Sequence, residues 1–184
     1  MPNPIHSLFH SKFIIGQNSI FQKHQTHPYR IMDDTQAIKA RLYNYCLNYV
    51  ENRIETATNA MNAAQAAANA EFKSSAGDKY ETTRAMMQIE KGLHTNQLAE
   101  ATKLKKELER ISIGNSHTSV VPGSLVFTES VCFFIAISAG KITLDGQEYI
   151  AVSAGSPIGI KLAGMKTGDE ITFNAQTLRI RAIG

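Results

Sequence analysis

Residues 76–81, Ala-Gly-Asp-Lys-Tyr-Glu, separate two long segments of helical periodicity and interrupt neither of their apolar stripes. This placement predicts the tip of a helical hairpin. Asp78 and Glu81 stand three residues apart in the predicted first turn of the second helix, where side chains at that spacing share a face. Spacing alone leaves two interpretations open. The pair forms two carboxylates projecting from the hairpin, or Asp78 caps the helix and Glu81 closes a capping box.

The segment before the tip predicts one long helix. Its helical pattern starts near Asp34 and continues for about 35 residues, on the order of 50 Å at 1.5 Å per residue. Beyond Ala57 the apolar face is almost entirely alanine, so a second helix can approach it closely and the outer half of the hairpin should be slender. The residues that mark this face are Leu42, Cys46, Val50, Ile54, Ala57, Met61, Ala64 and Ala68.

The segment after the tip predicts a second helix that packs on the first. One helix alone could not bury either stripe, and the connection between them is short, so we expect an antiparallel two-helix coiled coil over residues 32–112, with its tip near 74–81. The predicted packing face of the second helix contains Met86, Ile89, Leu93, Gln97, Ala101, Leu104, Leu108 and Ile111.

A change of period after a linker at 113–119 predicts a separate β-rich domain over residues 120–184. Six short β runs are expected at 124–128, 131–138, 142–144, 149–152, 169–173 and 178–183. Residues 156–164 predict one short helix that starts with Ser-Pro and ends with Gly. The fold class is therefore α+β. The predicted core of this domain consists of Val126, Phe133, Ile135, Ile137, Ile150, Ile158, Leu162, Ile171, Phe173 and Ile180.

Residues 1–31 differ in composition from the rest of the 184-residue chain. They contain three of the 19 basic residues and none of the 16 acidic ones, so the net charge of +3 arises here and the remainder is neutral. We expect a disordered N-terminal extension, and a neutral remainder argues against general polyanion binding. No apolar run approaches the roughly 18 to 20 residues that span a bilayer, which predicts a soluble protein without a membrane partner.

The chain carries none of the common enzyme motifs. It contains no dinucleotide-binding fingerprint, P-loop or nucleophile elbow, and His94 and His117 are not at metal-ligand spacing. Cys46 and Cys132 are expected to be buried free thiols in a reducing compartment. Cys132 has only apolar sequence neighbours and no base to form a thiolate, so a cysteine enzyme is rejected.

Residues 153–170 read Ser-Ala-Gly-Ser-Pro-Ile-Gly-Ile-Lys-Leu-Ala-Gly-Met-Lys-Thr-Gly-Asp-Glu. This string resembles the C-terminal signature of the GreA/GreB transcription elongation factors, in which Ser-Pro-Ile, Leu-x-Gly and Gly-Asp follow one another. Residues 120–126 are similar to the entry into the same domain. A helical hairpin followed by an FKBP-like domain is also the order of that family. The resemblance covers about residues 34–184 and implies a small FKBP-like curled sheet for 120–184, without prolyl isomerase activity.

The resemblance also implies a function. The hairpin would enter the secondary channel of bacterial RNA polymerase in the cytoplasm, where Asp78 and Glu81 help hold a Mg²⁺ shared with the polymerase and promote cleavage of backtracked RNA. The chain would be a monomer with no cofactor or enzyme activity of its own. It would meet the nascent RNA 3′ end only through the polymerase, and DNA of the transcription complex is a further candidate contact. Candidate polymerase-binding residues, with a structural role as the alternative, are Ser156, Pro157, Ile158, Gly168 and Asp169.

Two alternatives remain. The family tip reads Gly-Asp-Leu-Ser-Glu-Asn-Ala-Glu-Tyr, whereas residues 77–85 read Gly-Asp-Lys-Tyr-Glu-Thr-Thr-Arg-Ala. This departure fits a regulator that binds the channel without stimulating cleavage. A coiled-coil adaptor is the other alternative, and it should expose an apolar stripe on the outside of the hairpin. A channel-inserting arm should be polar outside, as suggested by Asn44, Asn48, Asn52, Glu55, Asn59 and Asn62.

Overall fold

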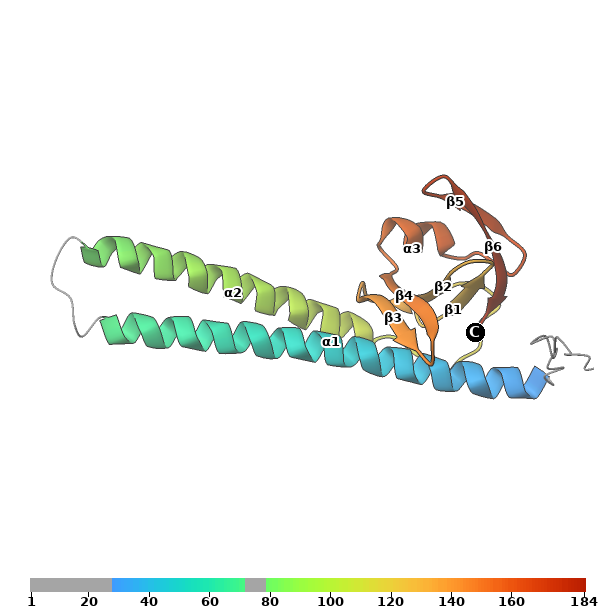
Figure 1. Ribbon diagram of the computed structural model, residues 1–184, viewed down its shortest axis with the longest axis horizontal. Helices are drawn as coiled ribbons and strands as arrows, with labels where there is room; N and C mark the ends of the chain where they lie inside the picture. Colours follow the sequence, from blue (N-terminus) through green and yellow to red (C-terminus); the bar gives the residue numbers. More distant parts are fainter. Residues whose placement is uncertain (1–27, 72–78) are drawn as a thin grey trace, which may run out of the picture.

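Two long helices precede a six-stranded mixed sheet and one short helix. The computed structural model describes residues 28–71 and 79–184, without the side chains of 28–34, 71 and 79–81. This arrangement confirms the predicted α+β class and the predicted order of the elements (Figure 1). The elements are α1 (Pro28–Glu71), α2 (Lys79–Glu109), β1 (Leu125–Thr128), β2 (Cys132–Ala136), β3 (Gly140–Leu144), β4 (Gln147–Ser153), α3 (Pro157–Leu162), β5 (Glu170–Phe173) and β6 (Gln176–Ile183).

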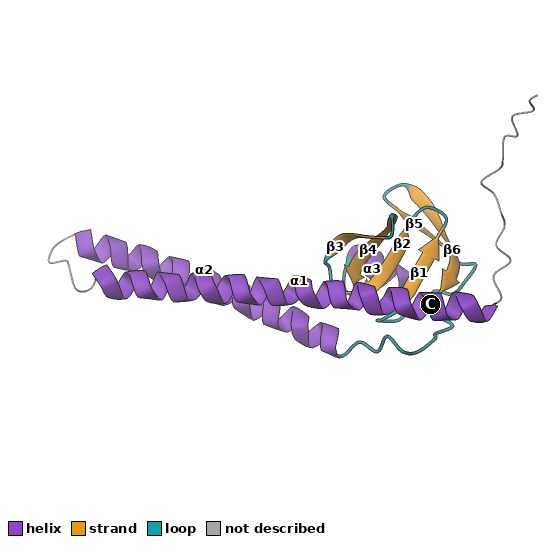
Figure 2. Cartoon of the chain, turned by 60° about the horizontal axis from the view of Figure 1, so that its bottom comes forward, coloured by secondary structure: helices purple, strands orange, loops and turns teal. Residues whose placement is uncertain are grey.

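Helix α1 is longer than the sequence predicts. It has 44 residues and begins at Pro28, ahead of the expected start near Asp34, in a position where the fixed φ of proline suits a first helical turn. Its predicted packing face is confirmed, since Leu42, Cys46 and Val50 have no exposed surface. The outer halves of α1 and α2 reach well beyond the sheet (Figures 1 and 2).

The sheet has the strand order β3-β4-β2-β1-β6-β5. Strands β2 and β4 pair in parallel, and every other neighbouring pair is antiparallel. All six predicted strands are present, with ends within a few residues of the expected ones. Asp145 and Gly146 both have positive φ in the two-residue turn between β3 and β4, the geometry that favours Asp-Gly in tight hairpins.

Apolar clusters cover both faces of the sheet. Strand β2 shows the alternation directly, because Phe134 faces one cluster and Phe133 the other. The second cluster, here called the outer core, joins the sheet to α3 through residues such as Ile158 and Leu162. The first, called the base core, joins the sheet to both long helices and consists of Leu42, Cys46, Val50, Leu108, Leu125, Phe134, Ala136, Ile137, Ile142, Tyr149 and Ala151.

Eight of the ten predicted core residues of the β domain are buried, and Ile150 and Phe173 are half-buried. The sequence analysis did not predict that Ile137 packs on the hairpin side of the sheet, within the base core. The hairpin and the sheet therefore share one hydrophobic core, which fixes how the two long helices sit against the domain.

Polar contacts add to this attachment. Lys39 has no exposed surface, and its Nζ donates a hydrogen bond to the carbonyl of Asn115 at 3.1 Å. Burial lowers the pKa of the Lys39 ammonium. Arg41 forms an exposed ion pair with Asp145 in the β3–β4 turn. The base of α1 thus holds both the segment after α2 and one hairpin of the sheet.

Candidate functional site

The two long helices have their adjacent ends at the part of the hairpin farthest from the sheet (Figure 1). Helix α1 ends at Glu71 and α2 begins at Lys79 (Figure 1). Asp78 lies outside the described residues, and Glu81 is described only by its backbone in the first turn of α2. Both interpretations of this pair, paired carboxylates or a helix cap, therefore stay predictions.

The Ser-Pro-Ile motif builds the start of α3. Ser156 caps the helix: its Oγ accepts a hydrogen bond from the backbone N–H of Gly159 at 3.1 Å. The same hydroxyl donates to the Ser153 carbonyl at 2.7 Å. Pro157 occupies the first helical position and is exposed, and Ile158 packs in the outer core. Any side chain at Gly159 would clash, because a Cβ there would lie 2.1 Å from the Ser153 carbonyl oxygen.

The Gly-Asp motif builds the turn before β5. Asp169 accepts a hydrogen bond from the backbone N–H of Lys166 at 2.7 Å through its Oδ2. Gly168 has a φ of +97°, a conformation that favours glycine. The two motifs that carry the family resemblance thus have defined roles in folding the domain. A polymerase-binding role for these residues stays a prediction.

Hydrogen bonds between the helices set the register of the hairpin. Lys105 Nζ donates to Glu51 Oε1 at 2.9 Å, and Lys91 Nζ donates to Gln65 Oε1 at 2.9 Å. Between these bonds, Thr95 Oγ1 donates to the Lys91 carbonyl and lies 3.9 Å from the sulfur of Met61. Every step forward along α1 is matched by an equal step back along α2, so the two helices run in opposite directions. In this register Ile89 lies level with Ala67, and Leu93 with Ala63.

The predicted packing face of α2 is correct at its base and wrong in its outer half. Ala101 and Leu108 are fully buried, and Leu108 packs in the base core with α1 and the sheet. Met86, Ile89 and Leu93 are 67%, 73% and 55% exposed instead. The base core fixes the rotation of α2. Seven residues make almost two full turns, so the buried face of Leu108 and Ala101 continues to His94 and Met87, which are half-buried.

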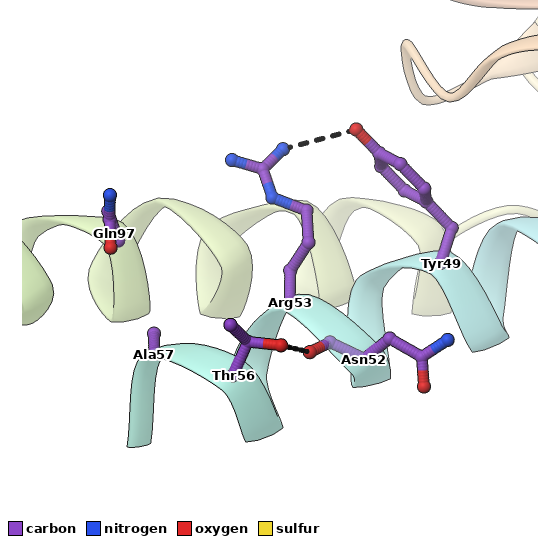
Figure 3. A pocket seen from close by; sticks show the side chains of 6 residues that line it. All are labelled: Tyr49, Asn52, Arg53, Thr56, Ala57 and Gln97. Carbon is purple, nitrogen blue, oxygen red and sulfur yellow. Dashed lines mark hydrogen bonds between the residues drawn. The ribbon is translucent and has the colours of Figure 1, made fainter. Parts of the chain in front are cut away.

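A groove that the sequence analysis missed lies between the two helices beside the sheet. It has a volume of about 420 Å³. Arg53 lies over the ring of Tyr49, with its guanidinium carbon 5.7 Å from the ring centroid, and an Arg53 Nη donates to the Tyr49 hydroxyl at 3.4 Å (Figure 3). No motif signals this groove, because its residues come from both helices. They are Tyr49, Asn52, Arg53, Thr56, Ala57 and Gln97.

Neither cysteine lies in an activating environment. Burial raises the pKa of the Cys46 thiol to about 12, and burial also raises the pKa of the half-buried Cys132 thiol. Both are free thiols, as expected, but only Cys46 is buried, so the predicted burial of Cys132 is wrong. The raised pKa values agree with the rejection of a cysteine nucleophile.

The described part of the chain shows neither a cluster of metal-ligating side chains nor a membrane-spanning helix. Within 28–71 and 79–184, no group of three or more His, Cys, Asp and Glu side chains is arranged to hold a metal ion. None of the helices described there is both long and apolar enough to cross a membrane.

The test that separates a channel-inserting arm from an adaptor gives a different result on each helix. The polar outer face predicted for α1 is confirmed, because Asn44, Asn48, Asn52, Glu55, Asn59 and Asn62 are all exposed. On α2, the exposed side chains of Met86, Ile89 and Leu93 form the apolar stripe expected of an adaptor.

No family model matches this chain, and no curated protein matches it either.

Proposed function

We propose that this protein is a Gre-like transcription elongation factor that binds bacterial RNA polymerase and promotes cleavage of backtracked RNA. One observation carries the proposal: a pair of long packed helices reaches beyond a small β domain, and the sequence places Gly-Asp-x-x-Glu where the two helices connect. In this proposal the hairpin is an antiparallel coiled coil that enters the secondary channel, and the β domain is FKBP-like and docks on the rim of the polymerase.

The roles of the tip residues follow from their chemistry. Asp78 and Glu81 would each offer a carboxylate oxygen, the ligand type that Mg²⁺ prefers, and two such groups are too few for a complete site. The polymerase would therefore supply the remaining ligands. When bound, the Mg²⁺ would activate a water for attack on the RNA backbone. The tip carboxylates position the ion, and the base core holds the hairpin at a fixed angle to the docking domain.

A shortened hairpin tests the binding part of this proposal. Replacing residues 58–98 by a short glycine-rich turn removes the outer half in register and keeps Leu42, Cys46, Val50 and Leu108 of the base core. We expect the variant to fold and to lose most of its affinity for a purified bacterial polymerase, measured by fluorescence anisotropy. A matched control, Asp78→Ala/Glu81→Ala, should bind as the wild type does. Equal binding by the shortened chain would refute channel insertion.

Two other functions remain as second candidates. Lys79 and the altered residues after Glu81 favour a channel-binding regulator that does not stimulate cleavage. The exposed Met86, Ile89 and Leu93 favour a coiled-coil adaptor. The regulator would bind polymerase through its outer hairpin without speeding cleavage. The adaptor would not bind polymerase at all.

A further inference from the structure

The outer half of α2 presents an apolar stripe that no described part of the chain covers. Five large hydrophobic side chains are exposed among the described residues, and three of them, Met86, Ile89 and Leu93, follow one another at helical spacing. Single exposed apolar residues are ordinary, but a contiguous row indicates an interaction surface. These three residues are called the α2 stripe below.

The neighbouring part of α1 is uncharged and carries exposed alanines among its exposed Asn and Gln side chains. Residues 56–70 contain no charged side chain, and four alanines there are exposed: Ala63, Ala66, Ala67 and Ala70. The register set by the cross-helix hydrogen bonds places Leu93 level with Ala63 and Ile89 level with Ala67. Large side chains on one helix therefore stand at the same height as small ones on the other.

The α2 stripe begins one helical turn beyond the groove at Tyr49 and Arg53, toward the tip. Gln97 and Thr56 line that groove, and one helical turn toward the tip leads from Gln97 to Leu93 and from Thr56 to Ala60. Lys91 is two residues away from both Ile89 and Leu93, and two residues correspond to a rotation of about 200° around a helix. Lys91 therefore lies on the side of α2 away from the stripe, where it donates a hydrogen bond to Gln65. The α2 stripe and alanines such as Ala63 and Ala67 thus lie on the same face of the hairpin as the groove, farther toward the tip.

The end of the groove beside the sheet carries a positive charge that pairs with no acidic side chain among the described residues. None of the ion pairs among the described residues involves Arg53, whose partner is the neutral hydroxyl of Tyr49. The surface nearer the tip consists of the α2 stripe, with Glu90 beside it, and the exposed α1 alanines, whereas the end beside the sheet offers a guanidinium that can bind a carboxylate. A complementary occupant is apolar along its length and acidic at one end.

We infer that this groove is the docking site of an amphipathic helix from a partner protein. The helix lays its apolar face on the α2 stripe and the α1 alanines, and its acidic end meets Arg53. The stretch of α1 from Arg53 to Ala70 is long enough for about five turns of a second helix to lie along it. A second copy fits less well. Two-fold pairing of the α2 stripes near Ile89 would bring the two Glu90 carboxylates together and leave Arg53 without a partner. This inference does not depend on the polymerase proposal.

Peptide binding to the full-length chain tests the inference. Two labelled peptides of about 18 residues carry leucine and alanine on one face and neutral polar residues elsewhere. One ends in glutamates and the other in lysines. We expect fluorescence anisotropy to show tighter binding of the glutamate peptide. Leu93→Glu should weaken it roughly tenfold or more by placing a charge on the apolar floor. Arg53→Gln should reduce the preference for the glutamate end by about two- to fivefold.

Ile160→Glu is the matched control, because Ile160 is 65% exposed but lies on α3, away from the groove. It should leave peptide binding unchanged, and circular dichroism should show that all variants keep their helix content. Equal binding to wild type and Leu93→Glu would overturn the inference, as would no binding of either peptide. Wild type that sediments as a dimer while Leu93→Glu sediments as a monomer would assign the groove to a second copy instead. Much tighter peptide binding after removal of residues 1–27 would assign it to that segment.

Discussion

The two halves of the hairpin obey different constraints. At the base, Leu42, Val50 and Leu108 are fully buried because the sheet supplies a third surface for the helices to cover. In the outer half only two helices meet, and α2 leaves Ile89 73% exposed while His94 is half-buried. The sheet therefore decides which face of α2 is buried, and the outer half inherits this rotation. An apolar stripe in the sequence marks a packing face only where something is present to cover it.

A pair of leucine substitutions would show this contrast most strongly. Leu108→Ala removes a fully buried side chain from the base core and should lower the free energy of unfolding by about 2–5 kcal/mol. Leu93→Ala removes a side chain that is 55% exposed and should change it by less than about 0.5 kcal/mol. Urea denaturation followed by circular dichroism measures both. Similar losses from the two variants would mean that the outer stripe is packed in solution.

Thiol reactivity sharpens the same comparison. In a Cys132→Ser background, Cys46 reports on the base and an added Leu93→Cys reports on the outer half. Because burial raises the pKa of Cys46 to about 12, its thiolate is scarce at pH 8. We expect it to react on the order of 1000-fold more slowly with a disulfide reagent than an exposed thiol at position 93. The rate for Cys46 should keep rising above pH 9, where the exposed thiol levels off. Comparable rates at pH 8 would contradict a closed base core.

Substitutions of Lys39 and Lys91 compare a buried lysine at the base of the hairpin with an exposed lysine in its outer half. Lys39→Met removes a buried ammonium whose hydrogen-bond partner, the Asn115 carbonyl, belongs to an exposed residue. The variant should be more stable than wild type by about 1 kcal/mol at pH 7. Lys91→Met, in the outer half, should leave stability unchanged within error. Urea denaturation measures both variants, and a marked loss of stability in Lys39→Met would show that the ammonium is needed for packing.

The difference in stability between wild type and Lys39→Met should change with pH in a defined direction. Burial lowers the pKa of Lys39 in the folded chain below its value of 10.5 in the unfolded chain, so the unfolded state binds this proton more tightly. Wild type should therefore gain stability relative to Lys39→Met as the pH rises through the lowered pKa toward 10.5. If the difference in unfolding free energy between wild type and Lys39→Met stays constant across this pH range, the lowered pKa of Lys39 is contradicted.

The Arg41–Asp145 ion pair should give the smallest effect. It is exposed, although it bridges α1 and the β3–β4 turn. A hydrogen bond and the positive charge of Arg41 lower the pKa of Asp145. The ion pair should contribute its full stabilisation of the folded state above the ordinary pKa of an aspartate. This stabilisation should be lost as the pH falls through the lowered pKa of Asp145. Arg41→Gln should cause a slight loss of stability that disappears in about 1 M salt. A loss that persists in salt would show a packing role for Arg41.

The sequence predicts the elements better than it predicts their contacts. Alternation, turn residues and the Ser-Pro start of α3 are local signals, and all six strands and both long helices follow from them. The rotation of outer α2 depends on a sheet that lies later in the chain, so no local pattern reveals the exposure of Ile89. The groove at Arg53 joins residues from two helices and was missed for the same reason. The role of Asp78 was predicted from spacing and from the family resemblance, and this residue lies outside the described part of the chain.

Transcript cleavage in a stalled, backtracked elongation complex tests the central claim most directly. Wild type, Asp78→Ala/Glu81→Ala and the hairpin with residues 58–98 replaced are each added to a bacterial polymerase, and the rate of RNA shortening is measured. The account predicts that wild type speeds cleavage, that the double variant binds without speeding it, and that the shortened hairpin does neither. Binding by wild type without faster cleavage would contradict the claim and identify a channel-binding regulator. No binding would leave the adaptor as the remaining candidate.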